Sequence, residues 1–197
     1  MTASSMAIRG LETVRGHVVQ RPEPTATDGV GFAHGFARYF RAQHDRLFRV
    51  LDRLTGDPDL AADLTQEAFI RLHGRGAMPD APDAWIITVA LNLFRNVQVS
   101  ARRRRELLTL ERGAALHSEP ARQDESTDAE DDRRQRVRSA LQSLPQRDRE
   151  LLLLRAEGYA YRDLAAALSL NSASVGVLLA RAKERFRRSY EGDSDAS

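Results

Sequence analysis

The chain has 197 residues, with 30 basic and 28 acidic side chains and a formal net charge of +2. It has no cysteine, which excludes disulfide scaffolds, thiolate metal sites and cysteine nucleophiles. Its five histidines lie far apart in the sequence and form no spaced ligand set, so we expect neither a metal nor a cofactor.

Residues 1–30 are predicted to be a disordered leader outside the fold. They are polar, they contain Pro22 and Pro24, and they lack the apolar run of a secretory signal. No stretch of the chain is apolar over the length needed to cross a bilayer. These features predict a cytoplasmic protein that does not enter a membrane.

Two helices are predicted after the leader. Apolar residues recur at helical spacing over 36–54 and end at Gly56, which indicates one long amphipathic helix. Asp57 is typical of a helix N-cap and Pro58 of the first helical position. A second amphipathic helix is therefore predicted from this point to the neighbourhood of Gly74.

A third long helix is predicted after a loop rich in glycine and proline. Trp85, Val89, Leu93 and Val97 recur every four residues and lead into four consecutive arginines, Arg102 to Arg105. The helix therefore has an apolar beginning and a strongly basic end.

An acidic segment at 111–132 separates two helical regions. It is nearly free of large apolar side chains, which favours an unfolded tether. We expect an all-α fold of two small domains, at 31–110 and 133–191, with a disordered tail at 192–197. Because the tether cannot pack the domains together, we expect them to fold independently.

The last part of the chain has the pattern of a helix-turn-helix. A short helix is predicted at 161–168, a turn at 169–171 with Asn171 as a cap, and a longer helix at 172–188. Val175, Leu179, Ala182 and Phe186 form the side of the longer helix that faces inward.

Polar and basic residues of the longer helix are candidates for contact with DNA. Arg181, Arg185 and Arg188 follow Ser174 and Leu178 at spacings of three and four, and Lys183 and Arg187 flank them. A solvated face of an ordinary helical bundle would show the same pattern. The excess of arginine over the single lysine, Lys183, also fits a genome rich in arginine codons.

The segment from Ala140 to Arg188 resembles the minus-35-binding domain of sigma-70-family factors, through Leu144-Pro145, Arg149-Glu150, Gly158, Tyr161, Asp163-Leu164-Ala165 and Leu179-Ala180-Arg181-Ala182. The segments Gly56 to Leu72 and Ala84 to Glu106 resemble the polymerase-binding and minus-10-melting regions of the same family. Because the third domain of larger members is missing, the chain is identified as a member of the compact extracytoplasmic-function group.

The resemblance implies a role for each region. Asp63, Gln66 and Glu67, which share one face of the second helix, are expected to bind core RNA polymerase. The expected minus-10 residues, which suit stacking and hydrogen bonding to unpaired bases, are Trp85, Thr88, Asn92, Asn96, Arg102, Arg103, Arg104 and Arg105. The expected minus-35 residues are Ser172, Ser174, Arg181, Lys183, Arg185 and Arg188.

Alternatives remain open at this point. The acidic face of the second helix is also explained by solubility, and Trp85 by a place in the core. The tether suits either a path used by RNA or plain flexible linkage.

The expected partners are core RNA polymerase, duplex minus-35 DNA and single-stranded minus-10 DNA, with an anti-sigma factor left open. The main rival is a helix-turn-helix regulator with a helical sensing domain, followed by an enzyme or a helical adaptor. An enzyme is disfavoured because the sequence offers no catalytic group of residues.

Two positions depart from the family pattern. Gly176 and Leu178 stand where many members have a lysine and an arginine early in the recognition helix. This removes two expected DNA contacts. Gly176 is expected to lower helix propensity and to allow another backbone to come close.

Overall fold

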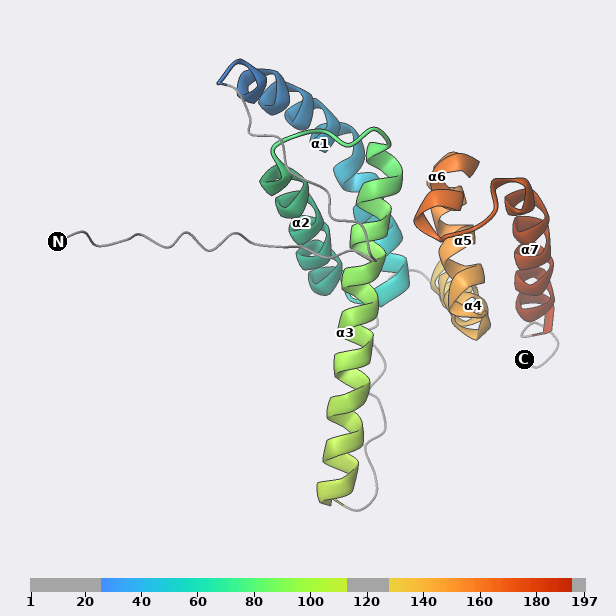
Figure 1. The fold of residues 1–197 in the computed structure, drawn as a ribbon. Helices are drawn as coiled ribbons and strands as arrows, with labels where there is room; N and C mark the ends of the chain where they lie inside the picture. Colours follow the sequence, from blue (N-terminus) through green and yellow to red (C-terminus); the bar gives the residue numbers. More distant parts are fainter. Residues whose placement is uncertain (1–25, 113–127, 193–197) are drawn as a thin grey trace.

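The structure is a computed structural model that describes residues 26–112 and 128–192. Within these ranges it has seven α-helices, one short 3-10 helix and no β-strand, which confirms the predicted all-α fold (Figure 1). The elements are α1 (Ala26–Thr55), α2 (Pro58–Arg75), α3 (Pro82–Arg112), α4 (Asp128–Ser143), α5 (Gln146–Ala156), α6 (Tyr161–Ala167), η1 (Ser172–Ser174) and α7 (Val175–Gly192).

The junction between α1 and α2 follows from its local sequence. Gly56 has a φ of 69°, a left-handed conformation that stops α1. The side chain of Asp57 then accepts hydrogen bonds from the backbone N–H groups of Asp59 and Leu60, at 3.0 and 3.1 Å. Asp57 is therefore the N-cap of α2, as the sequence predicts.

Three helices cross the predicted bounds of the leader and the tether, and α7 extends to Gly192, the first residue of the predicted tail. Helix α1 begins at Ala26, inside the predicted leader, while α3 runs to Arg112 and α4 begins at Asp128, both inside the predicted tether. The apolar pattern marks only the residues that pack, whereas an α-helix makes its backbone hydrogen bonds within itself and can extend beyond them. The rest of the leader, the centre of the tether and residues 193–197 lie outside the described residues.

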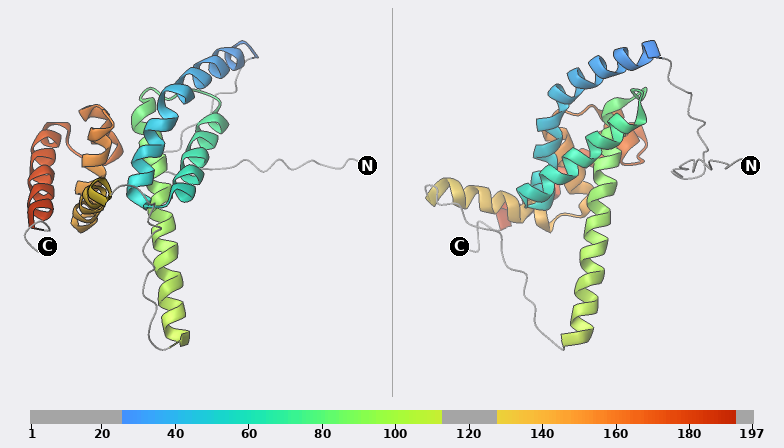
Figure 2. Two further views of the ribbon diagram at one scale, coloured as in Figure 1. Left: turned by 180° about the vertical axis from the view of Figure 1, so that it is seen from behind. Right: turned by 90° about the vertical axis from the view of Figure 1, so that its left-hand side faces the viewer.

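The N-terminal unit, α1 to α3, is built around a shared apolar core. Its fully buried side chains include Leu47, Leu51, Ala68, Leu72, Ile86 and Leu91, contributed by all three helices. Beyond this core, α3 projects away from both units (Figures 1 and 2). Its residues Asn96 to Ser100 and Arg102 to Glu106 are all exposed. The predicted basic end of the helix is thus held clear of the bundle.

The C-terminal unit contains the predicted helix-turn-helix. Helices α6 and α7 are its two helices, and η1 forms the first turn of the second one. The side chain of Asn171 accepts a hydrogen bond from the backbone N–H of Ala173 at 3.0 Å, which confirms the predicted cap. Gly158 has a φ of 83° and lets the chain reverse between α5 and α6.

The two units pack against each other, which the sequence did not predict. Helices α5 and α6 lie beside α1 and the first part of α3 (Figures 1 and 2). Glu157 accepts hydrogen bonds from Arg49 at 2.8 Å and from Arg53 at 2.6 Å. We call this contact region, formed by Arg46, Arg49, Arg53, Glu157 and Tyr159, the seam. Its residues come from the folded units themselves, so the lack of apolar groups in the tether does not keep the units apart.

Within the part of the chain that the structure describes, no single helix is long and apolar enough to cross a membrane. Helix α6 and the stretch Ser172–Gly192 pass such a test only when they are taken together, and they are bent by 119°.

Candidate functional site

The outward side of α2 carries the three residues predicted to bind polymerase. Asp63 and Gln66 are exposed, and the half-buried Glu67 forms an ion pair with Arg71 at 2.8 Å. The opposite side of α2, which includes Ala61, Leu64 and Leu72, is buried in the core. The structure therefore brings the three residues together on one solvent-facing side.

Sequence reasoning missed Ile70 on this side of α2. It follows Gln66 by one helical turn, and 54% of its surface is exposed. An apolar side chain opposite the buried stripe is the signal that could have identified it. We call Asp63, Gln66, Glu67 and Ile70 the α2 face.

The first part of α3 carries the predicted minus-10 residues with mixed exposure. Trp85 is half-buried and packs against the core, and Thr88 donates a hydrogen bond to the carbonyl oxygen of Ala84 at 2.7 Å. Asn92 and Asn96 are exposed. The core alternative for Trp85 thus holds in part, because its ring both packs on the core and reaches the surface.

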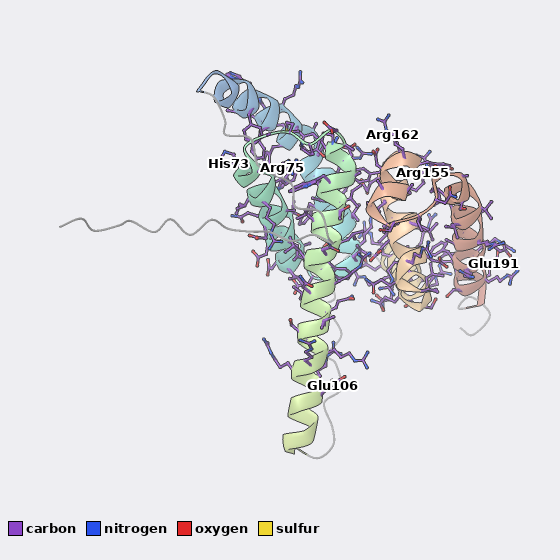
Figure 3. All side chains as sticks on the ribbon, in the orientation of Figure 1. His73, Arg75, Glu106, Arg155, Arg162 and Glu191 are labelled. Atoms are coloured by element: carbon purple, nitrogen blue, oxygen red, sulfur yellow. The ribbon has the colours of Figure 1, made fainter. Side chains whose placement is uncertain are left out.

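The four arginines from Arg102 to Arg105 are exposed on the projecting part of α3. Arg102 forms an ion pair at 2.8 Å with Glu106, one turn further along the helix. Glu106 is labelled on the projecting part of α3 in Figure 3. Exposed pairs of this kind contribute little to stability. This end of α3 therefore remains strongly cationic.

Sequence reasoning also missed Arg95, which lies on α3 between the two asparagines. It donates a hydrogen bond to Glu150 of α5 at 2.7 Å and one to Asn92 at 3.4 Å. Gln146 donates to the same carboxylate at 2.9 Å, so Glu150, although buried, has two polar partners. Nothing in the local sequence pairs Arg95 with Glu150, because they are far apart along the chain.

Arg95, Gln146 and Glu150 lie at an open hollow of about 400 Å³ between the two units. Its walls are formed by Arg95, Gln146, Arg147, Glu150, Leu168 and Ser169. Over 26–112 and 128–192, no group of three or more metal-ligating side chains comes together.

The predicted minus-35 residues fall into two groups. Arg181 and Lys183 are exposed and have no ion-pair partner among the described residues. Ser172 is exposed and Ser174 is half-buried at the start of the recognition helix. These four side chains are available to a ligand.

The other two predicted residues are engaged within the protein. Arg185 forms a short ion pair with Asp148, a buried carboxylate of α5. Arg188 forms an ion pair with Glu184 at 2.9 Å. Hydrogen bonds from Arg187 and Arg188 lower the pKa of Glu184 to about 2, so this carboxylate stays ionised at neutral pH.

Gly176 and Leu178, the two positions that depart from the family pattern, have different surroundings. Leu178 is half-buried and packs against the core, so it belongs to the structural side of α7. A Cβ atom at Gly176 would meet the Tyr161 ring at 3.8 Å, an ordinary contact. The close approach of another backbone predicted for Gly176 is therefore wrong, because its neighbour is a side chain.

Family models match both units of the chain. A model described as Sigma-70 region 2 matches residues 39–106, and one described as Sigma-70, region 4 matches residues 134–186. The two segments coincide with the helices that carry the faces described above.

Curated proteins similar to the chain are sigma factors. The RNA polymerase sigma-E factor of Streptomyces avermitilis is 33% identical over 173 residues, which cover 83% of this chain and 92% of the relative. The sigma factor EcfG of Rhodopseudomonas palustris is 32% identical, over 68% of this chain and 72% of the relative. SigE of Mycolicibacterium smegmatis is 29% identical, over 75% of this chain and 58% of the relative.

Two solved structures have a similar fold. RpoE of Bartonella quintana, in complex with the anti-sigma factor NepR, gives a TM-score of 0.55 at 24% identity and covers 80% of this chain and 97% of its own. CnrH, in complex with the cytosolic domain of CnrY, gives a TM-score of 0.56 at 21% identity over 85% and 95% of the two chains.

Proposed function

The chain belongs to the sigma-70 family, as a sigma factor of the extracytoplasmic-function group that directs RNA polymerase to promoters, and from this premise we propose which surfaces carry out each step. The single observation that carries the proposal is that three chemically different faces, on α2, α3 and α7, stay exposed while the two units are packed together.

The α2 face binds core RNA polymerase. Asp63 and Gln66 offer a carboxylate and an amide at the surface, and Ile70 adds an exposed apolar contact beside them. Such a face suits a partner helix with basic residues around an apolar centre, because complementary charges orient the partners and apolar burial supplies affinity.

Helix α3 holds the unpaired strand of the minus-10 element. Asn92 and Asn96 offer amides for hydrogen bonding to base edges, and the part of Trp85 that reaches the surface offers a ring for stacking. Arg102 to Arg105 attract the phosphate backbone along the projecting part of the helix. Stacking and hydrogen bonding offset the few kcal/mol that unstacking each base step costs, so melting requires no ATP.

The recognition helix, formed by η1 and α7, binds duplex DNA at the minus-35 element through Ser172, Ser174, Arg181 and Lys183. The N-terminal part of a recognition helix usually contacts bases, and cationic residues further along it contact phosphates. Arg185 acts mainly within the protein, because it binds the buried carboxylate of Asp148. Arg188 can still contact phosphate, because its pair with Glu184 is exposed.

The proposed function includes no catalytic step by the protein. The protein acts in the cytoplasm, where polymerase and promoter DNA are found. The family consists of transcription initiation factors. The solved complex of RpoE with an anti-sigma factor supports a partner of that kind for this chain too.

A reconstituted run-off transcription assay tests the proposal. Core polymerase and fragments of the source genome are incubated with and without the protein. We expect transcripts with defined start sites only when the protein is present. Failure to bind core polymerase, together with tight binding to a duplex operator by the protein alone, would favour the regulator instead.

A further inference from the structure

The outward side of the recognition helix begins with an exposed valine. Val177 is 55% exposed, and Arg181, Glu184 and Arg188 follow it at spacings of four, three and four. Val175, Leu179 and Ala182 are buried on the opposite side. Val177 is therefore at the middle of the side that faces a ligand, in the first turn of α7.

Its neighbours on this side are small and apolar. Ala173 and Ala180, which lie four residues before and three residues after Val177, are both exposed. Gly176 has no side chain that could cover the valine. We call Ala173, Val177 and Ala180 the Val177 face.

Cationic side chains flank this face at both ends of the first turns of α7, and we call Arg155, Arg162, Arg181 and Lys183 the cationic rim. Arg181 and Lys183 follow along α7, and both are exposed. Arg155 lies 5.3 Å from the ring centroid of Tyr161, and that ring lies against Gly176. Arg155 and Arg162 lie at the end of the C-terminal unit where α7 begins (Figure 3). An apolar centre within a cationic rim suits nucleic acid better than a protein, because the rim matches phosphates.

In the major groove, the one apolar group that a base pair presents is the C5 methyl of thymine. Guanine is usually read by arginine or lysine and adenine by asparagine or glutamine. The Val177 face has none of these side chains. We propose that it recognises thymine methyl groups in the minus-35 element, so that apolar contact takes the place of hydrogen bonding at these base pairs. The inference rests on the proposed function of α7.

The test removes only the methyl group from the DNA. Duplexes that the holoenzyme binds best are first selected from a random library, and each thymine of the minus-35 element is then replaced by deoxyuridine. Burial of one methyl predicts that the critical replacements weaken wild-type binding by about fourfold each. This ratio should not change with salt, because a methyl contact releases no counterions.

The Val177→Ala variant and the deoxyuridine replacement together form a double-mutant cycle, with one change in the protein and one in the DNA. We expect the variant's thymine-to-deoxyuridine ratio to fall to about one at the same positions, while its polymerase binding and helix content stay unchanged. Val99→Ala is the matched control, because Val99 is a similarly exposed valine on α3, at 49% against 55%, away from the helix-turn-helix. Its ratio should stay at about four.

The possible results distinguish a failure of the thymine-methyl inference from a failure of the proposed function of α7. If the holoenzyme selects no duplex at all, the assignment of α7 fails and the inference fails with it. If it selects duplexes but tolerates deoxyuridine at every position, the assignment of α7 stands and the inference is overturned. A Val177→Ala variant that loses polymerase binding would show a protein-docking surface, and one that binds polymerase but keeps the fourfold ratio would show that Val177 does not contact the methyl group; either result would also overturn it.

Discussion

The guanidinium carbon of Arg46 lies 3.8 Å from the centroid of the Tyr159 ring, so a side chain of α1 covers a tyrosine of the C-terminal unit. Tyr159 is fully buried, and burial raises the pKa of its hydroxyl. Arg46 also donates a short hydrogen bond to the carbonyl oxygen of Glu157. A cation over an aromatic face is stabilising, and more so where one partner is buried, as Tyr159 is. Arg46 therefore links the two units through a ring contact and a hydrogen bond.

The first prediction concerns the carboxylate of the seam. Only 8% of the Glu157 side chain is exposed, and it binds Arg49 and Arg53. We call the arrangement in which the two units pack at the seam the closed arrangement. Glu157→Gln should weaken it by about 1 to 2 kcal/mol, allowing for the water that reaches both arginines. The population of molecules whose two units are apart should rise about 5- to 30-fold.

Small-angle X-ray scattering of the free protein measures this change as a larger radius of gyration. Glu67→Gln is the matched control, because Glu67 pairs with an arginine of its own helix. An unchanged radius in Glu157→Gln would show that the charge pairs do not hold the seam.

The second prediction is that acid loosens the seam. Burial alone would raise the pKa of Glu157, but hydrogen bonds and charges from Arg49 and Arg53 outweigh it, and the net shift is below the ordinary 4.5. A lowered pKa in the closed state means that the carboxylate stabilises closure above about pH 4.5 and loses this effect as the pH falls below that value. A scattering titration should show expansion below pH 4.5 in the wild type and a weaker pH response in Glu157→Gln.

The third prediction separates two arginines of α7 that look alike in the sequence. Arg181→Ala should make the salt dependence of DNA binding shallower by about one unit of log-log slope, because a free cation that meets a phosphate releases counterions. Arg185→Ala should leave the slope nearly unchanged. It should instead lower the free energy of unfolding by about 1 to 3 kcal/mol, because the buried Asp148 loses its cation.

Holoenzyme binding across a salt series and urea denaturation of the free protein measure the two effects. Equal loss of slope in both variants would mean that Arg185 leaves Asp148 to contact DNA.

The fourth prediction tests the α2 face. Asp63→Arg combined with Glu67→Arg should abolish co-purification with core polymerase, because it reverses the charge offered to the partner. Asp132→Arg, an exposed acidic residue of α4, is the control and should bind normally. Circular dichroism should show unchanged helix content in both proteins. Undiminished binding by the double variant would remove polymerase from this face.

The fifth prediction contrasts two glycines. Gly158→Ala should lower the free energy of unfolding by about 1 to 2 kcal/mol, because its φ of 83° is left-handed. Gly176 lies in the first turn of α7 with room for a Cβ atom, so Gly176→Ala should raise stability by up to about 1 kcal/mol. Urea midpoints give both values, and two changes of the same sign would contradict the assigned conformations.

The sequence by itself determined the local features of the fold. Asp57 and Asn171 could be assigned as caps because a cap bonds to backbone groups two or three residues away. The spacing of Val175, Leu179 and Ala182 determined which side of α7 is buried, since helical periodicity is fixed. By the same rule, Val177 was identifiable as the middle of the opposite side.

Only the tertiary structure decided which charged groups are free and which are engaged. Arg185 and Asp148 are 37 positions apart, Arg95 and Glu150 are 55 apart, and Arg49 and Glu157 are 108 apart. No local rule links residues at such distances, because their pairing depends on how helices pack rather than on the period of one helix. Packing therefore leaves Arg181 and Lys183 exposed and pairs Arg185 with Asp148. It also joins two units whose contact could not be predicted from the composition of the tether.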